Sequence, residues 1–263
     1  EAIEAYERLV RQWPTSEQAR VAAENLQTIC TEQGELQRYL SFIKSVPNAP
    51  QPDADRVARL AYQAAMNAIE RNPRDMSPLE NFVNDYPLSP DVPDALLELA
   101  DYYKTNGAQE KALAVVSKIL SEYPHSKGVA PALLLKGELL ASRGDKNGAS
   151  SAYRSLLDTF GSSYARQAYM GLMQNASDPA AIINYAERLL SLPDVPAADR
   201  RRAELCRAEA LMNAGRLNEA LAALSPLASD MRTAAGGHAA VMMARIYLQQ
   251  NQPSKAEGIM NRF

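Results

Sequence analysis

The chain has 263 residues, of which 46% are hydrophobic and only 6% aromatic, and its formal net charge is −3. Much of the hydrophobic material is alanine, which suits closely packed helices better than a sheet rich in β-branched residues. The negative net charge gives no overall attraction to nucleic acid, and no run approaches the ~20 apolar residues of a membrane-spanning helix. The composition therefore favours an all-helical chain that binds no nucleic acid.

The charge is distributed unevenly along the chain. Residues 1 to 130 hold 13 Lys/Arg against 19 Asp/Glu, a net charge of −6, and residues 131 to 263 hold 15 against 12, a net charge of +3. Because helix surfaces are commonly charged, the simplest interpretation is a set of solvated outer faces. The alternative is a polarised binding surface.

The first residues carry Ala2, Tyr6, Leu9 and Val10 at helical spacing, followed by Trp13-Pro14. This segment matches the second helix of the pairs that follow, so we interpret it as a second helix whose first helix is missing. The sequence has no initiator Met and no charged-then-apolar leader, so we expect that any targeting signal has been removed or lay upstream. The last pair is expected to stop at Phe263 inside its second helix.

The stretch from Pro93 to Ser126 shows the organisation of the rest of the chain most clearly. An amphipathic helix before Gly107 and another before Tyr123 are joined by a tight turn. Such a hairpin leaves one apolar face uncovered and needs a neighbour on which to pack. The same pattern recurs, with a three-proline connection at 47–52, in eight predicted units: 1–14, 15–47, 48–87, 88–124, 125–161, 162–193, 194–231 and 232–263.

Two kinds of punctuation separate these predicted helices. Glycine, or Asn251 in the equivalent place, ends each first helix and suits a left-handed residue; these glycines are Gly34, Gly107, Gly144 and Gly215. An aromatic residue, then Pro or Gly, then Ser ends several second helices. We expect the aromatic to close the core and the Ser to cap the next helix, most clearly at Ser89-Pro90. These motifs are 13–16, 86–89, 123–126 and 160–163.

Small and apolar residues recur at fixed places in the two helices of each unit. They are Ala100, Gly137, Ala208 and Ala244, then Tyr103, Leu140, Leu211 and Tyr247, and then Ala112, Ala149, Ala181, Ala220 and Ala256. This series resembles the tetratricopeptide repeat over essentially the whole chain, although the consensus Trp is replaced by Leu or Ala and the repeat length varies. The resemblance implies a right-handed superhelical solenoid of stacked antiparallel helix pairs. The aromatic-Pro-x-Ser endings are most similar to tetratricopeptide-repeat proteins of the bacterial cell envelope.

The sequence contains no constellation that predicts an enzyme, and no cofactor follows from it. His125 is expected in a loop between repeats and His238 near the start of the last first helix, each as an ordinary histidine without metal-ligand spacing. Cys30 and Cys206 lie within helical apolar patterns and are expected to be small core residues. Met170 and Met173, one turn apart, are interpreted as repeat packing, with an adaptable binding surface as the alternative.

Two charged groups allow a sharper interpretation. Glu98, Asp101 and Glu138 could form a paired-carboxylate site of the glycosidase type, but a solvated or groove-lining acidic patch is the simpler interpretation. The run 199–202, Asp-Arg-Arg-Arg, could hold phosphate or an acidic peptide. The simpler interpretation is that it begins a helix on its polar side.

The resemblance implies a non-catalytic scaffold that binds a protein or peptide segment in a concave groove lined by the first helix of each pair. Alignment with the groove-facing positions of the family gives an acidic-plus-aliphatic strip, expected to favour a basic and apolar segment. It contains Asp94, Leu97, Asp101, Lys104, Leu134 and Glu138. The alternatives are a helical support of a larger enzyme and a self-associating spacer. The periplasm or outer membrane is implied by the resemblance alone.

Overall fold

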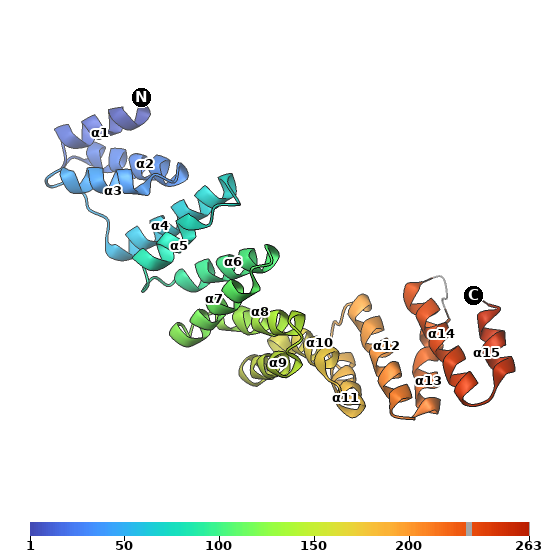
Figure 1. The fold of residues 1–263 in the computed structure, drawn as a ribbon. Coiled ribbons are helices and arrows are strands. Elements are labelled where there is room, and N and C mark those ends of the chain that lie inside the picture. The colour runs from blue at the N-terminus through green and yellow to red at the C-terminus, as the bar shows by residue number, and fades with distance from the viewer. Residues whose placement is uncertain (230–232, 263) are drawn as a thin grey trace. The chain divides into compact units, whose positions relative to one another are not determined.

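The computed structural model describes residues 1–229 and 233–262, and these ranges contain helices and no strand. The chain forms two compact units, Glu1–Val129 and Ala130–Phe263. Within each unit, consecutive helices double back on one another and pack side by side (Figure 1). The predicted all-α class and the stacked antiparallel helix pairs are confirmed.

The first unit has its core between helices that are neighbours in the sequence. The largest fully buried side chains include Leu26, Ile43, Leu79 and Ile119, from four different helices. Burial also raises the pKa of the Cys30 thiol, and Cys30 is a core residue as predicted. The helices are α1 (Ala2–Gln12), α2 (Glu17–Glu32), α3 (Leu36–Ser45), α4 (Ala54–Arg71), α5 (Ser77–Asp85), α6 (Val92–Thr105) and α7 (Gln109–Glu122).

The second unit continues the same arrangement with one irregularity, a short 3-10 helix between two α-helices. Leu156, Leu172, Leu189, Leu211, Leu224 and Ile246 are fully buried along it. Its helices are α8 (Val129–Ser142, which starts at the last residue of the first unit), α9 (Lys146–Phe160), η1 (Gly161–Tyr164), α10 (Ala165–Asn175), α11 (Pro179–Leu190), α12 (Ala197–Asn213), α13 (Leu217–Leu227), α14 (Ala234–Gln249) and α15 (Pro253–Met260).

The eight repeat boundaries and the single continuous solenoid stay predictions. The two compact units divide at residues 129 and 130, inside the predicted unit 125–161. None of the helices in the described ranges is long and apolar enough to cross a membrane.

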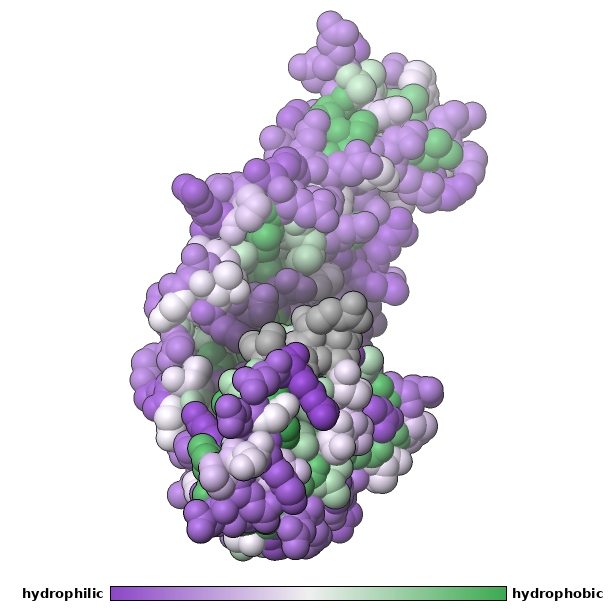
Figure 2. All heavy atoms as spheres, turned by 90° about the vertical axis from the view of Figure 1, so that its right-hand side faces the viewer, coloured by the Kyte–Doolittle hydropathy of each residue, from purple (hydrophilic) through white to green (hydrophobic). Residues whose placement is uncertain are grey.

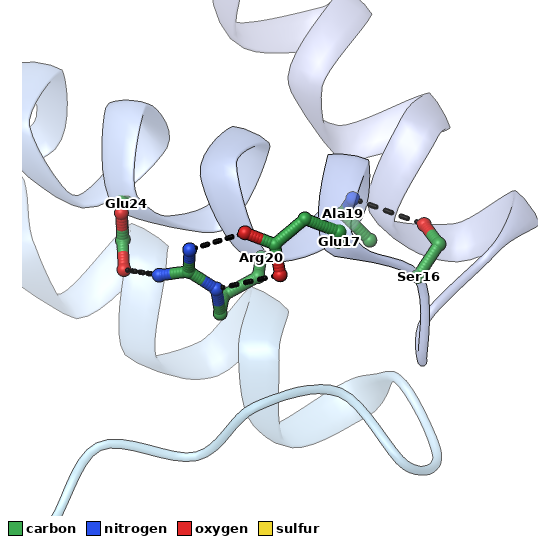
Figure 3. Close-up of polar contacts among 5 residues, drawn as sticks. All are labelled: Ser16, Glu17, Ala19, Arg20 and Glu24. Carbon is green, nitrogen blue, oxygen red and sulfur yellow. Dashed lines mark hydrogen bonds and ion pairs between the residues drawn. The ribbon is translucent and has the colours of Figure 1, made fainter.

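Ser16 begins α2 in the predicted way. Its hydroxyl oxygen accepts a hydrogen bond from the Ala19 amide at 3.1 Å, which satisfies one of the amides that a helix leaves unpaired at its start (Figure 3). One turn further on, the Arg20 guanidinium pairs with Glu17 and with Glu24, the latter at 2.7 Å. The polar side of α2 is thus stabilised locally by a cap and two neighbouring carboxylates.

The other three predicted serine caps are wrong. After Tyr86, a turn precedes the helix, so α6 begins at Val92 and its first-turn proline is Pro93 and not Pro90. Ser89 instead accepts a hydrogen bond from the Asp91 amide at 3.3 Å within that turn. The buried Ser126 hydroxyl has no hydrogen-bond partner, and Ser163 lies inside η1. A turn inserted between motif and helix moves the serine away from the capping position.

The predicted left-handed turn residues are confirmed at all five places. Their φ angles are +74° at Gly34, +75° at Gly107, +80° at Gly144, +72° at Gly215 and +57° at Asn251. Asn48 and Asp194 also have positive φ, 61° and 54°, each directly after the proline that follows a second helix. The short polar side chains of Asn and Asp tolerate this conformation better than other non-glycine residues do.

The ring of Tyr153 fills a slot between two helical glycines. A Cβ atom at Gly137 of α8 would lie 2.5 Å from Tyr153 Cε1, and one at Gly171 of α10 would collide with the opposite edge of the ring. Burial, with a further contribution from the charge of Glu138, raises the pKa of Tyr153 to about 12. The small residue predicted at Gly137 is therefore required by an aromatic ring of α9.

Most of the predicted repeat alanines lie in the core, but some apolar predictions differ from the structure. Cys206, predicted to be a core residue, is only half-buried against the core of the second unit. Ala181, near the start of α11, is only half-buried. Trp13 was expected to close the core, yet it is 55% exposed. Tyr123, in the same motif, is half-buried and donates its hydroxyl to the Pro87 carbonyl of the preceding loop at 2.9 Å.

We predict that Gly107→Val lowers the free energy of unfolding by more than ~1 kcal/mol, because a β-branched residue resists a φ of +75°. Space is not the cause, since nothing lies within 4 Å of a Cβ placed there. Gly107→Asn should cost less, because Asn251 adopts the same conformation in an equivalent turn. Chemical denaturation of both variants measures this, and an unchanged midpoint for the valine variant would contradict it.

We also predict that Gly171→Ala destabilises the second unit by about 1–3 kcal/mol, because the added methyl group overpacks the Tyr153 ring. Gly258→Ala is the matched control, since its new Cβ would meet nothing within 4 Å. Adding Tyr153→Leu should remove most of the cost of Gly171→Ala, so that the two changes are not additive in denaturant. Additive effects would show that the ring and the glycine do not interact.

Candidate partner-binding surface

Four of the predicted groove residues form one stripe along α6. Asp94, Leu97, Asp101 and Lys104 follow one another at helical spacing, and none of them is buried. The opposite side of α6 carries the buried residues Ala95, Leu96, Leu99 and Ala100. Neighbouring helices therefore occupy one face of α6 and leave the predicted stripe, which we call the α6 strip, at the surface.

The carboxylate at the start of the α6 strip is already paired. Asp94 Oδ2 lies 2.7 Å from the Nζ atom of Lys127, and the two side chains are 30% and 76% exposed. The hydrogen bond that Lys127 donates to Asp94, followed by the negative charge of Asp94, raises the pKa of the Lys127 ammonium group. Asp94 thus ties the start of α6 to the loop after α7, whereas the Asp101 side chain is exposed further along the strip.

The remaining two groove residues lie on α8, in the second unit. Leu134 is half-buried and Glu138 is exposed, one turn apart on the same helix. Both residues have the exposure expected of a binding surface. Their participation in one groove with the α6 strip stays a prediction.

The acidic residues that raised a glycosidase hypothesis are divided between the units. Glu98 and Asp101 are exposed on α6, and Glu138 belongs to α8 of the second unit. Among the residues that the structure describes, no group of three His, Cys, Asp or Glu residues could hold a metal ion. The arrangement within each unit is that of acidic side chains on a helix surface.

The basic run is divided by its contacts. It lies at the start of α12, as predicted. Asp199 accepts a hydrogen bond from Arg166 of α10 at 2.6 Å, which joins neighbouring first helices. Arg200 donates to the Leu190 carbonyl at 3.5 Å. Only Arg201 and Arg202 are left to line a surface depression, which they share with His238.

The histidines and methionines occupy their predicted places. His125 lies in the loop after α7 and His238 on the first turns of α14. Met173 is buried and Met170 half-buried against the core of the second unit. The interpretation of this pair as repeat packing is confirmed.

Leu88 is a surface feature that the sequence analysis missed. It is 96% exposed, in the motif where the equivalent positions are Thr15, His125 and Ser162. Prolines surround it in a depression of about 540 Å³ that also includes Tyr123 and His125. The sequence could have indicated this feature, because Leu88 is the one apolar residue at a motif position where the other three loops have a polar residue.

A second feature that was missed is a depression of about 610 Å³ in the second unit, between α9, η1, α10 and α11. We call it the α9/α11 depression. Its lining includes two arginines and two tyrosines: Arg154, Arg188, Tyr169 and Tyr185. The only sequence signal for it was Gly161, which stands where the related loops have proline. The face of the molecule seen in Figure 2 is mainly hydrophilic, with small apolar patches between.

Comparisons with known proteins identify the repeat. Residues 94–126, which contain the α6 strip and α7, match the family model of the tetratricopeptide repeat. No curated protein matches the sequence. The matched segment is one tetratricopeptide repeat, and stacked helix pairs lie on both sides of it.

Two solved structures are among those similar to this chain. One is a tetratricopeptide repeat protein from Parabacteroides merdae, with 19% identity, 99% of this chain and 83% of that chain covered, and a TM-score of 0.40. The other is the structure of Naa15/Naa10 bound to HypK-THB, with 18% identity, 98% of this chain and 41% of that chain covered, and a TM-score of 0.40. At these values the two structures say nothing about what this chain binds.

Proposed function

We propose that the chain is a non-catalytic scaffold that binds a segment of a partner protein along the exposed faces of its first helices. The observation that carries this proposal is the α6 strip, in which a half-buried Leu97 lies between the carboxylates of Asp94 and Asp101. An apolar side chain flanked by charges can supply contact area, while the charges select the partner and speed its approach.

The chemistry of the strip favours a partner segment with basic and apolar residues. Asp94 is engaged by Lys127, so Asp101 is the main carboxylate for a basic partner on α6. On α8, Leu134 and Glu138 repeat the same combination of an aliphatic residue and an acid. We propose that both helices contact the partner and that this binding needs no cofactor.

The setting of this function is also a proposal. The recurrent aromatic-Pro-x-Ser endings favour a bacterial envelope assembly, in the periplasm or at the outer membrane. A helical support of a larger enzyme and a self-associating spacer are the alternative functions. The full-length gene would reveal a catalytic domain, and light scattering would detect self-association.

The test is to capture partners from an extract of the source cell with the wild type and with Asp101→Lys and Glu138→Lys, separately and together. Each reversal should reduce capture of partners with basic segments, and the wild-type interaction should weaken as salt screens the charges. Glu122→Lys is the matched control, because it makes the same change on an exposed residue of the second helix α7.

Circular dichroism and denaturation must first show that all variants fold equally. If the captured proteins and their salt sensitivity were the same for the wild type, the groove variants and Glu122→Lys, the α6 strip and the α8 pair would not be the binding surface. The loop edge around Leu88 would then be examined next.

A further inference from the structure

The α9/α11 depression has the size and composition of a binding site and lies outside the α6 strip. Its volume of about 610 Å³ falls within the ~300–1,000 Å³ usual for ligand sites. The walls come from the second helices α9 and α11, from η1 and from α10. It therefore belongs entirely to the second unit, whereas the α6 strip belongs to the first.

Two arginines of the depression are held by neutral groups alone. Arg154 Nη2 donates to the Tyr185 hydroxyl at 3.4 Å, and Arg188 Nε donates to Asn184 Oδ1 at 3.0 Å. Within residues 1–229 and 233–262, neither guanidinium forms an ion pair, in contrast to Arg166 and Arg207 of the same unit. Both therefore retain N–H donors in the geometry that suits a carboxylate.

The charge of the depression favours an anion. Asp158 is the one acidic residue of its lining, against Arg154 and Arg188. The unit around it is also positive, with 15 Lys/Arg against 12 Asp/Glu over residues 130–263. An anionic partner would be attracted by the unit as a whole and paired by the two arginines.

Apolar walls accompany the arginines. The rings of Tyr169 and Tyr185 stack with centroids 6.5 Å apart, both rings are half-buried, and Leu157 and Leu192 complete the walls. Tyrosine and arginine are enriched where protein interfaces concentrate their binding energy, because they combine large contact area with directed hydrogen bonds. The depression thus has an apolar surface beside two cationic groups.

The loop at Gly161 shapes one wall of the depression. Gly161 has a φ of +52° and a ψ of −128°, a conformation that is essentially restricted to glycine. Proline, which occupies this place in the loops at Pro14, Pro87 and Pro124, has φ fixed near −65° and could not adopt it. The chain instead enters η1 here, and Gly161 and Ser162 of η1 line the depression.

We propose that the α9/α11 depression binds an acidic segment of a partner protein, with a carboxylate paired to Arg154 or Arg188 and an aromatic or aliphatic side chain against Tyr169 and Tyr185. The partner differs in charge from the one proposed for the α6 strip. The scaffold would then hold two segments of opposite charge on separate units.

An array of immobilised short peptides tests this proposal, with acidic and aromatic residues placed at varied positions, and with matched series in which Gln replaces Glu or Ala replaces the aromatic. The wild type should retain acidic peptides that contain an aromatic or aliphatic residue. In solution, Arg154→Glu/Arg188→Glu should weaken the best peptide by about tenfold or more. Arg245→Glu, an exposed charge reversal on α14, should have a much smaller effect.

Asp101→Lys serves to separate this site from the α6 strip, because it should leave binding of the acidic peptide intact. The proposal would be overturned if the array retained no acidic peptide, or if Arg245→Glu weakened binding as much as the double reversal. Self-association of the wild type that the double reversal abolishes would also overturn it, since a second copy of the chain would then be the occupant.

Discussion

The packing of the second unit depends on close approach between helices of adjacent pairs, and the Tyr153 ring shows how this is achieved. The ring from α9 lies between Gly137 of α8 and Gly171 of α10, with no room for a methyl group on either side. In the hairpin of α8 and α9 alone, one side of this ring would be exposed. The next hairpin, α10 and α11, covers that side of the ring and buries its own apolar face in the same contact. Close packing of this kind makes each pair a structural requirement of its neighbour.

Such packing also determines which surfaces are available for binding. Helix α6 buries Leu96, Leu99 and Ala100 and leaves the α6 strip at the surface. Where the repeat is irregular, at Gly161 and η1, the packing leaves the α9/α11 depression instead. The proposed partner segments are opposite in charge to the units that would bind them. The first unit, proposed to bind a basic segment, holds 13 Lys/Arg against 19 Asp/Glu, and the second, proposed to bind an acidic segment, holds 15 against 12.

The predictions from sequence succeeded where a residue type is required by local geometry. A turn with φ near +75° favours glycine regardless of its surroundings, so Gly34, Gly107, Gly144 and Gly215 located the turns correctly. The helical period also predicted the burial of Ala100, Ala112 and Ala149, because residues at helical spacing share the packed face of their helix. The serine caps failed at Ser89 and Ser126 because an added turn separates each from its helix, and the motif alone does not show whether that turn is present.

Features that depend on contacts distant in sequence were not predictable. The pairing of Asp94 with Lys127 joins residues of different elements, and the α9/α11 depression brings together side chains from 154 to 192. The hydrogen bond from the Tyr123 hydroxyl to the Pro87 carbonyl likewise joins residues 36 positions apart. Periodicity places a residue on a face of its own helix, but it does not show what the neighbouring elements contribute to that face.

Site-specific photocrosslinking tests the scaffold account most directly. A photoreactive residue would replace either Leu97, on the α6 strip, or Ala114, which is exposed on the second helix α7. Irradiation in the source cell should crosslink partner proteins mainly from position 97, through peptides rich in Lys or Arg near an apolar residue. Equal crosslinking from both positions, or none from position 97 in a folded protein, would contradict binding along the first helices.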